Sequence, residues 1–339
     1  MPSALSFWYG KPGMLARAFI PLSAIYARVA RSRAARITPY RSKLPVICVG
    51  NFTAGGGGKT PTAIAIAKML QAQGMRPCFL TRGYGGKISG PHLVSETDGA
   101  DQVGDEPLLL AAVAPTVIAA NRADGAKFIE GLDADVIVMD DGFQNPQLAK
   151  DLSLIAVDSG RGIGNGFVLP AGPLRAPLGE QMAHADALIV IGEGEKAASL
   201  AGDFAKAGKP VFNARIVPQG DSRWLGVLPV IGFAGIARPE KFFMTLQSNG
   251  ARLEGRRAFP DHHCFSEKEA ASLLKAAQEQ KCMLVTTEKD WVRLPEDRES
   301  PLGELKFRSR PLPIALQFED EPGVSGLLQA AVAKAHKAD

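Results

Sequence analysis

Acidic residues are missing from the first part of the chain. No Asp or Glu occurs among residues 1–95, although thirteen of the 39 Lys and Arg residues lie there. In the rest of the chain, 35 acidic residues outnumber the other 26 basic ones. A basic segment of this kind indicates contact with an anionic partner, which leaves nucleic acid, a phosphorylated ligand and a membrane surface as candidates.

Cysteine is scarce and shows no pattern. The four cysteines (Cys48, Cys78, Cys264 and Cys282) have no CxxC spacing and no set of histidines nearby. This excludes a disulfide framework and a zinc site, and it fits a reducing cytoplasm. The chain of 339 residues, 46% hydrophobic and 22% charged, has the composition of a globular protein with room for two domains.

Long apolar runs are also absent. None reaches the roughly 18 residues that a bilayer-spanning helix needs. Among residues 1–40 the longest uncharged stretch, residues 18–27, contains Pro21 and has basic residues on both sides. This pattern does not fit a signal peptide.

Residues 1–43 are expected to form a helical segment that associates with a membrane. On a helix, one face carries an apolar stripe formed by Leu15, Phe19, Leu22, Tyr26 and Val29, and the opposite face carries Arg17, Arg28 and Arg31. Such a helix can lie on anionic lipid, with Trp8 and Tyr9 at the headgroups, or can pack its stripe on its own protein. The sequence leaves both interpretations open. Pro21 is expected to kink or split the helix.

Residues 46–60 read VICVGNFTAGGGGKT, an apolar run that ends in four glycines and Lys59-Thr60. The pattern predicts a buried strand, a glycine loop whose backbone N–H groups surround phosphate oxygens, and a helix. Lys59 can reach the β- and γ-phosphates, and the Thr60 hydroxyl can hold Mg²⁺. The predicted cradle consists of Thr53, Ala54, Gly55, Gly56, Gly57, Gly58, Lys59 and Thr60. A nucleoside triphosphate and Mg²⁺ are therefore the predicted ligands.

Carboxylates at two other places are candidates for metal binding or catalysis. The apolar segment VIVMDD ends in Asp140 and Asp141, 80 residues after Thr60, where P-loop proteins hold Mg²⁺. Asp105 and Glu106 begin a predicted helix, where acidic side chains either cap the helix or take part in chemistry. Glu106 is included as a further metal ligand.

An arginine and a histidine pair complete the candidate site. Arg175 lies in the proline-broken loop LPAGPLRAP, where a guanidinium either clamps a phosphate or is solvated. His262 and His263 follow Asp261 in FPDHHCF, and no packing pattern explains them.

The alternation of strands and helices predicts an α/β protein with a mostly parallel P-loop NTPase core sheet. Core strands are expected at residues 77–81, 116–119, 136–139, 152–157, 187–191 and 211–217, besides the one before the glycine loop. A smaller α/β unit is expected from strands 230–233, 252–257, 283–286 and 313–317 and helices 239–248, 266–280 and 324–336. The predicted boundaries are 1–43 for the N-terminal segment, 44–220 for the P-loop core domain and 221–339 for the smaller second domain.

Seven segments together resemble the tetraacyldisaccharide 4′-kinases, also called lipid A 4′-kinases. In chain order they are VGNFTAGGGGKTP, TRGYGG, GDEPLLLA, DDGFQN, GPLR, FPDHH and TTEKDWVRL. The resemblance implies ATP-dependent phosphorylation of the 4′-hydroxyl of a tetraacylated, 1-phosphorylated glucosamine disaccharide, which gives lipid IVA. It also implies a peripheral protein at the cytoplasmic face of the inner membrane, with a lid that closes on the nucleotide.

The resemblance assigns roles to several residues. Asp105 of GDEP becomes the catalytic base, His262 of FPDH its assistant, and Arg175 of GPLR a phosphate or transition-state ligand. An alcohol nucleophile needs such a proton acceptor, and Lys59 with Mg²⁺ then offsets charge on the transferring group. The chain departs from the family at Asn145, where DDGxQH has His, so no role of that His is transferred.

Other function classes use a similar loop. Dimeric P-loop ATPases at membranes carry KGGxGKT, and Ala54 occupies the position of its first lysine here. A nucleotide-gated membrane adaptor would use the loop and the N-terminal helix without needing Asp105 or His262. Nucleic acid is not a predicted partner, because no recognition motif accompanies the basic residues 28–43.

Overall fold

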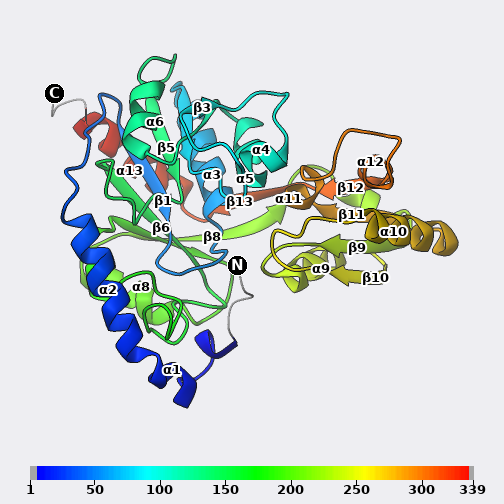
Figure 1. The fold of residues 1–339 in the computed structure, drawn as a ribbon, viewed down its shortest axis with the longest axis horizontal. Helices are drawn as coiled ribbons and strands as arrows, with labels where there is room; N and C mark the ends of the chain where they lie inside the picture. The colour runs from blue at the N-terminus through cyan, green and yellow to red at the C-terminus, as the bar shows by residue number, and fades with distance from the viewer. Residues whose placement is uncertain (1–5, 336–339) are drawn as a thin grey trace.

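The computed structural model describes residues 6–335, which form two β-sheets with helices on both faces (Figure 1). Across the large sheet the strands are β13 (Ile314–Phe318), β8 (Val211–Pro218), β7 (Ala187–Ile191), β6 (Leu152–Asp158), β1 (Val46–Gly50), β5 (Val136–Asp140), β2 (Pro77–Thr81), β4 (Thr116–Ile118) and β3 (His92–Leu93). Across the small sheet they are β10 (Leu253–Ala258), β9 (Val230–Ala234), β11 (Met283–Thr287) and β12 (Ser309–Leu312).

The large sheet is parallel except at its two edges, where β3 and β13 run antiparallel to their neighbours. Strands β1, β2, β5 and β7 are buried along their whole length, as expected for a parallel sheet covered on both faces. Helices α3 (Lys59–Ala72), α5 (Asp105–Ala111) and α13 (Glu321–Ala335) cover one face, and α6 (Arg122–Ile129), α7 (Leu178–His184) and α8 (Ala198–Lys206) the other. The predicted α/β core is confirmed.

The C-terminal strand and helix return to the large sheet. β13 pairs antiparallel with β8, and α13 packs on the same core as α3. The sequence placed residues 313–339 in the second unit, which is wrong for their described part; residues 336–339 lie outside it. Strand spacing cannot reveal this return, because an edge strand from either sheet has the same apolar pattern. β8 and β13 extend toward the small sheet in Figure 1.

The small unit has its own two cores. Helix α9 (Pro239–Ser248) packs on one face of the parallel four-stranded sheet, and α10 (Glu267–Gln280) and α12 (Pro301–Arg308) on the other. Ser266 begins α10 with a capping box, since its hydroxyl accepts the Glu269 N–H while the Glu269 carboxylate accepts the Ser266 N–H. The shorter elements are α4 (Ala100–Val103), α11 (Glu288–Trp291) and η2 (Arg223–Gly226).

The N-terminal segment forms η1 (Ser6–Trp8), α1 (Met14–Ala18) and α2 (Ile20–Ala34). The predicted break is confirmed, because Pro21 lies in the first turn of α2, where its missing N–H costs nothing. Small side chains face the protein: Ala16 is buried, and the Ser23 hydroxyl donates to the Val168 carbonyl at 2.8 Å. Within residues 6–335, no helix combines the length and apolarity needed to cross a bilayer.

The apolar stripe of α1 and α2 points to solvent. Leu15 is 57% exposed, Leu22 51%, Tyr26 41% and Val29 44%. Only Phe19 is half-buried, where its ring stacks on Phe7. Packing of the whole stripe on the protein, one of the two interpretations of the sequence, is therefore wrong.

Candidate functional site

The glycine loop joins β1 to the first turn of α3. Gly55 and Gly58 have φ of 107° and 81°, and a Cβ on Gly58 would lie 2.5 Å from the Ile191 side chain. Only glycine fits there. In the described part of the chain, no group accepts a hydrogen bond from the N–H groups of residues 55–58. These donors are thus free to bind phosphate oxygens, and Lys59 lies beside them with Nζ 3.3 Å from the Gly55 carbonyl.

The start of the predicted cradle is used differently. The Ala54 N–H donates to the Pro173 carbonyl at 2.8 Å, and the Thr53 carbonyl accepts from Arg175 Nε at 3.3 Å. Ala54 therefore does not offer its N–H to a phosphate in this structure. Asn51, which sequence reasoning missed, is buried and donates from Nδ2 to the Gly55 carbonyl, so it fixes the shape of the loop.

Thr60, Asp140 and Asp141 come together at the carboxyl ends of β1 and β5. The Thr60 hydroxyl donates to Asp140 Oδ2 at 3.0 Å, and Lys59 Nζ lies 3.6 Å from Asp141 Oδ2. The Oδ1 atoms of both aspartates are buried, and no group within residues 6–335 donates a hydrogen bond to them. Orphaned carboxylate oxygens beside a hydroxyl are the hard ligands that Mg²⁺ prefers, so these residues fit the ion.

The two aspartates are in different electrostatic states. Burial, followed by the charges of Glu106 and Asp141, raises the pKa of Asp140 to about 7. Burial also opposes ionisation of Asp141, but the charges of Lys59 and Arg175 outweigh it and lower its pKa. A divalent cation bound here would offset these effects and favour the ionised form of Asp140. Asp141 also has a φ of 53°, a conformation that a non-glycine residue seldom adopts outside functional sites.

Arg175 lies between the glycine loop and the carboxylates. Its Nη2 is 3.4 Å from Asp141 Oδ2, and its Nη1 donates to Gln144 Oε1 at 3.4 Å. Gln144 in turn donates to the Asn51 carbonyl at 2.7 Å. The guanidinium predicted from GPLR is therefore at the phosphate loop rather than in solvent.

Asp105 and His262 meet across the two sheets, 157 residues apart in sequence. Asp105 is 5% exposed at the start of α5, and its Oδ2 lies 3.1 Å from His262 Nδ1 and also accepts from Arg293. Burial opposes ionisation of Asp105, but the His262 hydrogen bond and the charges of Lys289 and Arg293 hold its pKa well below the usual range. Like Asp141, His262 has a positive φ, 58°.

Glu106 does not join the other metal candidates directly. Its Oε1 accepts from Lys289 Nζ at 3.0 Å, and the same Nζ lies 3.3 Å from His262 Nε2. Glu106 still acts on the site through its charge, since it is the strongest charged influence on the pKa of Asp140. Its role as a metal ligand stays a prediction.

Sequence reasoning gave no role to Tyr84, Lys289 and Arg293. Tyr84 of TRGYGG places its ring 5.2 Å from the His262 ring, edge to face. Lys289 and Arg293 of TTEKDWVRL follow β11, where Thr287 caps α11 and turns it toward α5. All three residues lie in motifs that the sequence shows, but only the packing of the two units reveals that they lie at the Asp105–His262 pair.

Comparison with known proteins identifies the chain. A model of the family described as tetraacyldisaccharide-1-P 4′-kinase matches residues 15–333. The chain belongs to this family. It is 48% identical over 330 residues to the tetraacyldisaccharide 4′-kinase of Rhizobium meliloti, which covers 97% of this chain and 95% of that protein. It is 47% identical over 331 residues to the one of Methylorubrum populi, covering 97% and 98%.

A solved structure of the family has the same fold. LpxK from Aquifex aeolicus, in complex with ATP, superposes with a TM-score of 0.68 at 26% sequence identity. The match covers 94% of this chain and all of that one. The family resemblance of the seven sequence motifs is thereby confirmed, and the predicted use of ATP agrees with a relative that binds it.

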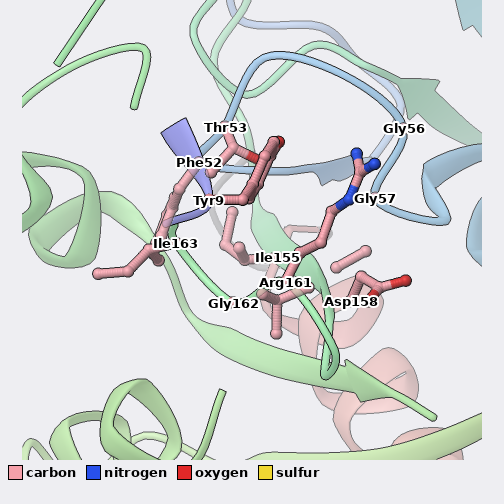
Figure 2. A pocket seen from close by; sticks show the side chains of 12 residues that line it. Tyr9, Phe52, Thr53, Gly56, Gly57, Ile155, Asp158, Arg161, Gly162 and Ile163 are labelled. Atoms are coloured by element: carbon pink, nitrogen blue, oxygen red, sulfur yellow. The ribbon is translucent and has the colours of Figure 1, made fainter. Parts of the chain in front are cut away.

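The N-terminal segment of this LpxK family member reaches the glycine loop. Trp8 Nε1 donates to the Pro170 carbonyl at 3.0 Å, in the loop that leads to Arg175. Tyr9 lines a pocket beside the glycines, with the Arg161 guanidinium 4.5 Å from its ring centre (Figure 2). The Tyr9 hydroxyl is 3.5 Å from the Ala54 carbonyl. The N-terminal segment that carries the exposed apolar stripe therefore also packs beside the glycine loop.

We expect Tyr9→Ala to weaken nucleotide binding by about three- to tenfold, because it removes a cation–π contact and a support of the loop. Tyr9→Phe is the matched control, since it keeps the ring over Arg161 and should retain most of the affinity. Titration with an ATP analogue measures both. Equal affinity of Tyr9→Ala and the unchanged protein would contradict this coupling.

Proposed function

We propose that this chain transfers the γ-phosphoryl group of ATP to the 4′-hydroxyl of a tetraacylated glucosamine disaccharide 1-phosphate, giving lipid IVA. The carrying observation is that the glycine loop and the carboxylate pair meet at one edge of the large sheet, and that Asp105 of the same unit contacts His262 of the small unit. Membership of the tetraacyldisaccharide-1-P 4′-kinase family supports this choice of acceptor. An adaptor would not need a carboxylate and an imidazole in contact beside the phosphate loop.

The residues fit an in-line transfer. The acceptor hydroxyl gives its proton to Asp105 while its oxygen bonds to the γ-phosphorus, and the bond to the bridging oxygen of ADP breaks. Among the residues that the structure describes, Asp105 Oδ1 accepts only the Glu106 N–H, at 2.8 Å, so it has a lone pair left for that hydroxyl. His262 orients the carboxylate from Oδ2. Lys59 and Arg175 lie where they offset charge on the phosphoryl oxygens.

Thr60, Asp140 and Asp141 would hold the metal. When bound there, Mg²⁺ neutralises charge on the β- and γ-phosphates. The buried, partnerless oxygens of the two aspartates support this assignment.

Mixing the purified protein with Mg-ATP and the acylated disaccharide 1-phosphate tests the function. The expected product is the 4′-phosphorylated disaccharide with one ADP released per phosphate, detected by mass spectrometry. ATP binding without phosphoryl transfer to this acceptor would contradict the proposal and favour the adaptor.

The proposed location is the cytoplasmic face of the inner membrane, as a peripheral protein on anionic lipid. The exposed stripe supports it, together with the complete lack of acidic residues before Glu96. The apolar side chains match the hydrocarbon region of a bilayer, and the basic side chains that flank them match its anionic headgroups. The helices would seat the glycine loop next to the acceptor headgroup.

We expect Leu15→Glu with Leu22→Glu to release the protein from vesicles that contain anionic lipid. Both side chains are more than half exposed, so the fold should be unaffected while two carboxylates meet the anionic surface. Cosedimentation measures the bound fraction, and Phe128→Glu, an exposed apolar residue of α6, is the matched control. Full retention on the vesicles would show that the stripe does not contact lipid.

A further inference from the structure

Lys289 contacts both the imidazole of His262 and the residue next to the proposed base. Its Nζ lies 3.3 Å from His262 Nε2 and 3.0 Å from Glu106 Oε1. The other ring nitrogen of His262, Nδ1, lies 3.1 Å from Asp105 Oδ2. Because Asp105 and Glu106 are consecutive residues at the start of α5, the four side chains form a closed ring of contacts. This ring joins α5 on the large sheet to α11 of the small unit, which lie side by side (Figure 1).

The groups on the two sides of the imidazole have fixed hydrogen-bonding roles. A lysine ammonium has three N–H donors and no acceptor, whereas an ionised carboxylate only accepts. Burial opposes the charge on Lys289, but the charges of Glu106 and Asp105 outweigh it and raise the pKa of the ammonium. The pKa of Asp105 lies well below its usual range, so this carboxylate is ionised. His262 therefore meets a donor at Nε2 and an acceptor at Nδ1.

The backbone of His262 is held so that the ring faces both groups. Its N–H donates to the Gly235 carbonyl at 3.1 Å, and the same carbonyl accepts from Arg293 Nη1 at 3.0 Å. Asp290 is fully buried and holds both partners, since its Oδ2 accepts the Gly235 N–H and its Oδ1 accepts from Arg293. Turning the imidazole by 180° would point ring carbons at the carboxylate and the ammonium. The observed ring orientation thus makes two contacts that the turned ring would lose.

Other charged groups reach the imidazole less directly. Asp261 Oδ1 lies 4.0 Å from the imidazole Nε2, which is too far for a hydrogen bond, so Lys289 is the closer group at this nitrogen. Glu106 is paired with the ammonium, and Arg293 binds the carboxylate on the far side of the ring. Tyr84 contacts the ring edge to face. Lys289 is therefore the group that decides what Nε2 can do.

Resting on the function proposed above, we infer that Lys289 is a positioning residue that keeps the proton of His262 on Nδ1 and closes Nε2 to a second proton. Nδ1–H donates to Asp105, and Nε2 accepts from the ammonium, because the bond at one ring nitrogen sets the state of the other. The imidazole is then neutral. It cannot take the hydroxyl proton over from Asp105, since Nδ1 already carries a proton. Asp105 keeps that proton through the transfer.

The neutral ring has a consequence for the base. An imidazolium in contact with Asp105 would favour the ionised carboxylate and weaken it as a proton acceptor. The charge of Lys289 does not act in the same way, because Glu106 balances it at 3.0 Å. Lys289 thus supplies a hydrogen bond to His262 without turning it into a cation beside the base.

The first test places the protons by nitrogen-15 NMR of the histidine side chains in the full chain. The resonances that are missing from His262→Asn identify His262. At pH 7 we expect one protonated and one unprotonated ring nitrogen in the unchanged protein, with the proton on Nδ1. In Lys289→Met, which has a similar volume but no donor, a second proton should appear on Nε2 in a measurable fraction of the molecules.

The second test measures phosphoryl transfer in the same variant. We expect kcat of Lys289→Met to fall about 10-fold at pH 7 and to recover in part at pH 9, where the extra proton on His262 is lost. KM for ATP should stay the same. Lys289→Arg is the matched rescue, since a guanidinium also only donates, and it should restore the NMR pattern and most of kcat. Lys275→Met, which removes an exposed lysine of α10 paired with Glu279, is the control for a lost positive charge.

Each outcome decides the inference. A loss at pH 7 that accompanies the second ring proton and is rescued by Lys289→Arg supports it. A proton on Nε2 of His262 in the unchanged protein overturns it without any variant. An unaltered His262 spectrum in Lys289→Met also overturns it, and an equal loss of kcat at both pH values would then assign Lys289 a purely structural role. If the unchanged protein transfers no phosphoryl group to the acceptor, the proposed function fails, and the NMR comparison still decides where the protons lie.

Discussion

We expect Asp105→Asn to lower kcat for 4′-phosphorylation by about 10²- to 10⁴-fold, the range that a positioned general base contributes, and to retain ATP binding. The amide has nearly the same shape as the carboxylate but cannot take the hydroxyl proton. In the described part of the chain, the side chain of Asp105 bonds to Glu106, His262 and Arg293 and to no group of the glycine loop, so the nucleotide should still bind. Single-turnover transfer, with separate titration of an ATP analogue, measures the two effects.

Stability is the necessary control, because Asp105 is buried and accepts from Arg293. Arg293 keeps a second carboxylate in the variant, since its Nη1 donates to Asp290 Oδ1 at 2.8 Å. The thermal midpoint should therefore fall only modestly. His262→Asn removes the partner but not the base, and we expect a smaller loss than for Asp105→Asn. Transfer at an unchanged rate in Asp105→Asn would remove the assignment of the base.

Much of the fold was predictable because it depends on local patterns. The glycine loop, the strands that alternate with helices, and the break at Pro21 each arise from residue types at short spacing. The antiparallel return of β13 to β8 does not, because its apolar alternation suits an edge of either sheet. The sequence also did not determine that the apolar stripe around Leu22 faces outward, because an amphipathic pattern shows two faces but not which one meets the protein.

The candidate site, like the fold, has one part that the sequence predicts and another that it does not. Lys59 and Thr60 follow β1, Asp140 ends β5, and these two strands are neighbours in the sheet. Strand order alone therefore brings the three residues together. The Asp105–His262 contact joins two units and was available only from the family resemblance. The positions of Lys289 and Arg293 beside Asp105 depend on how the two units pack, and no spacing rule in the sequence relates them.

We expect Asp140→Asn to abolish the effect of Mg²⁺ on both activity and stability. We expect kcat to fall by about 100-fold or more, because several kcal/mol of charge stabilisation on the phosphates depend on the ion. Without metal, however, the variant should be more stable than the unchanged protein at pH 8. There the unchanged protein must keep two neighbouring carboxylates ionised, each with a buried Oδ1 that no described residue donates a hydrogen bond to.

The pH dependence follows from the pKa of Asp140, about 7 in the folded protein against 3.8 when unperturbed. Between these values the folded chain binds more protons at this group than the unfolded chain, so stability falls as pH rises. Mg²⁺ competes with the proton, hence it should stabilise little at pH 5 and increasingly toward pH 8. Thermal unfolding with and without Mg²⁺ across this range measures the effect. A Mg²⁺-induced shift of the thermal midpoint that does not depend on pH, or that persists in Asp140→Asn, would place the ion at another site.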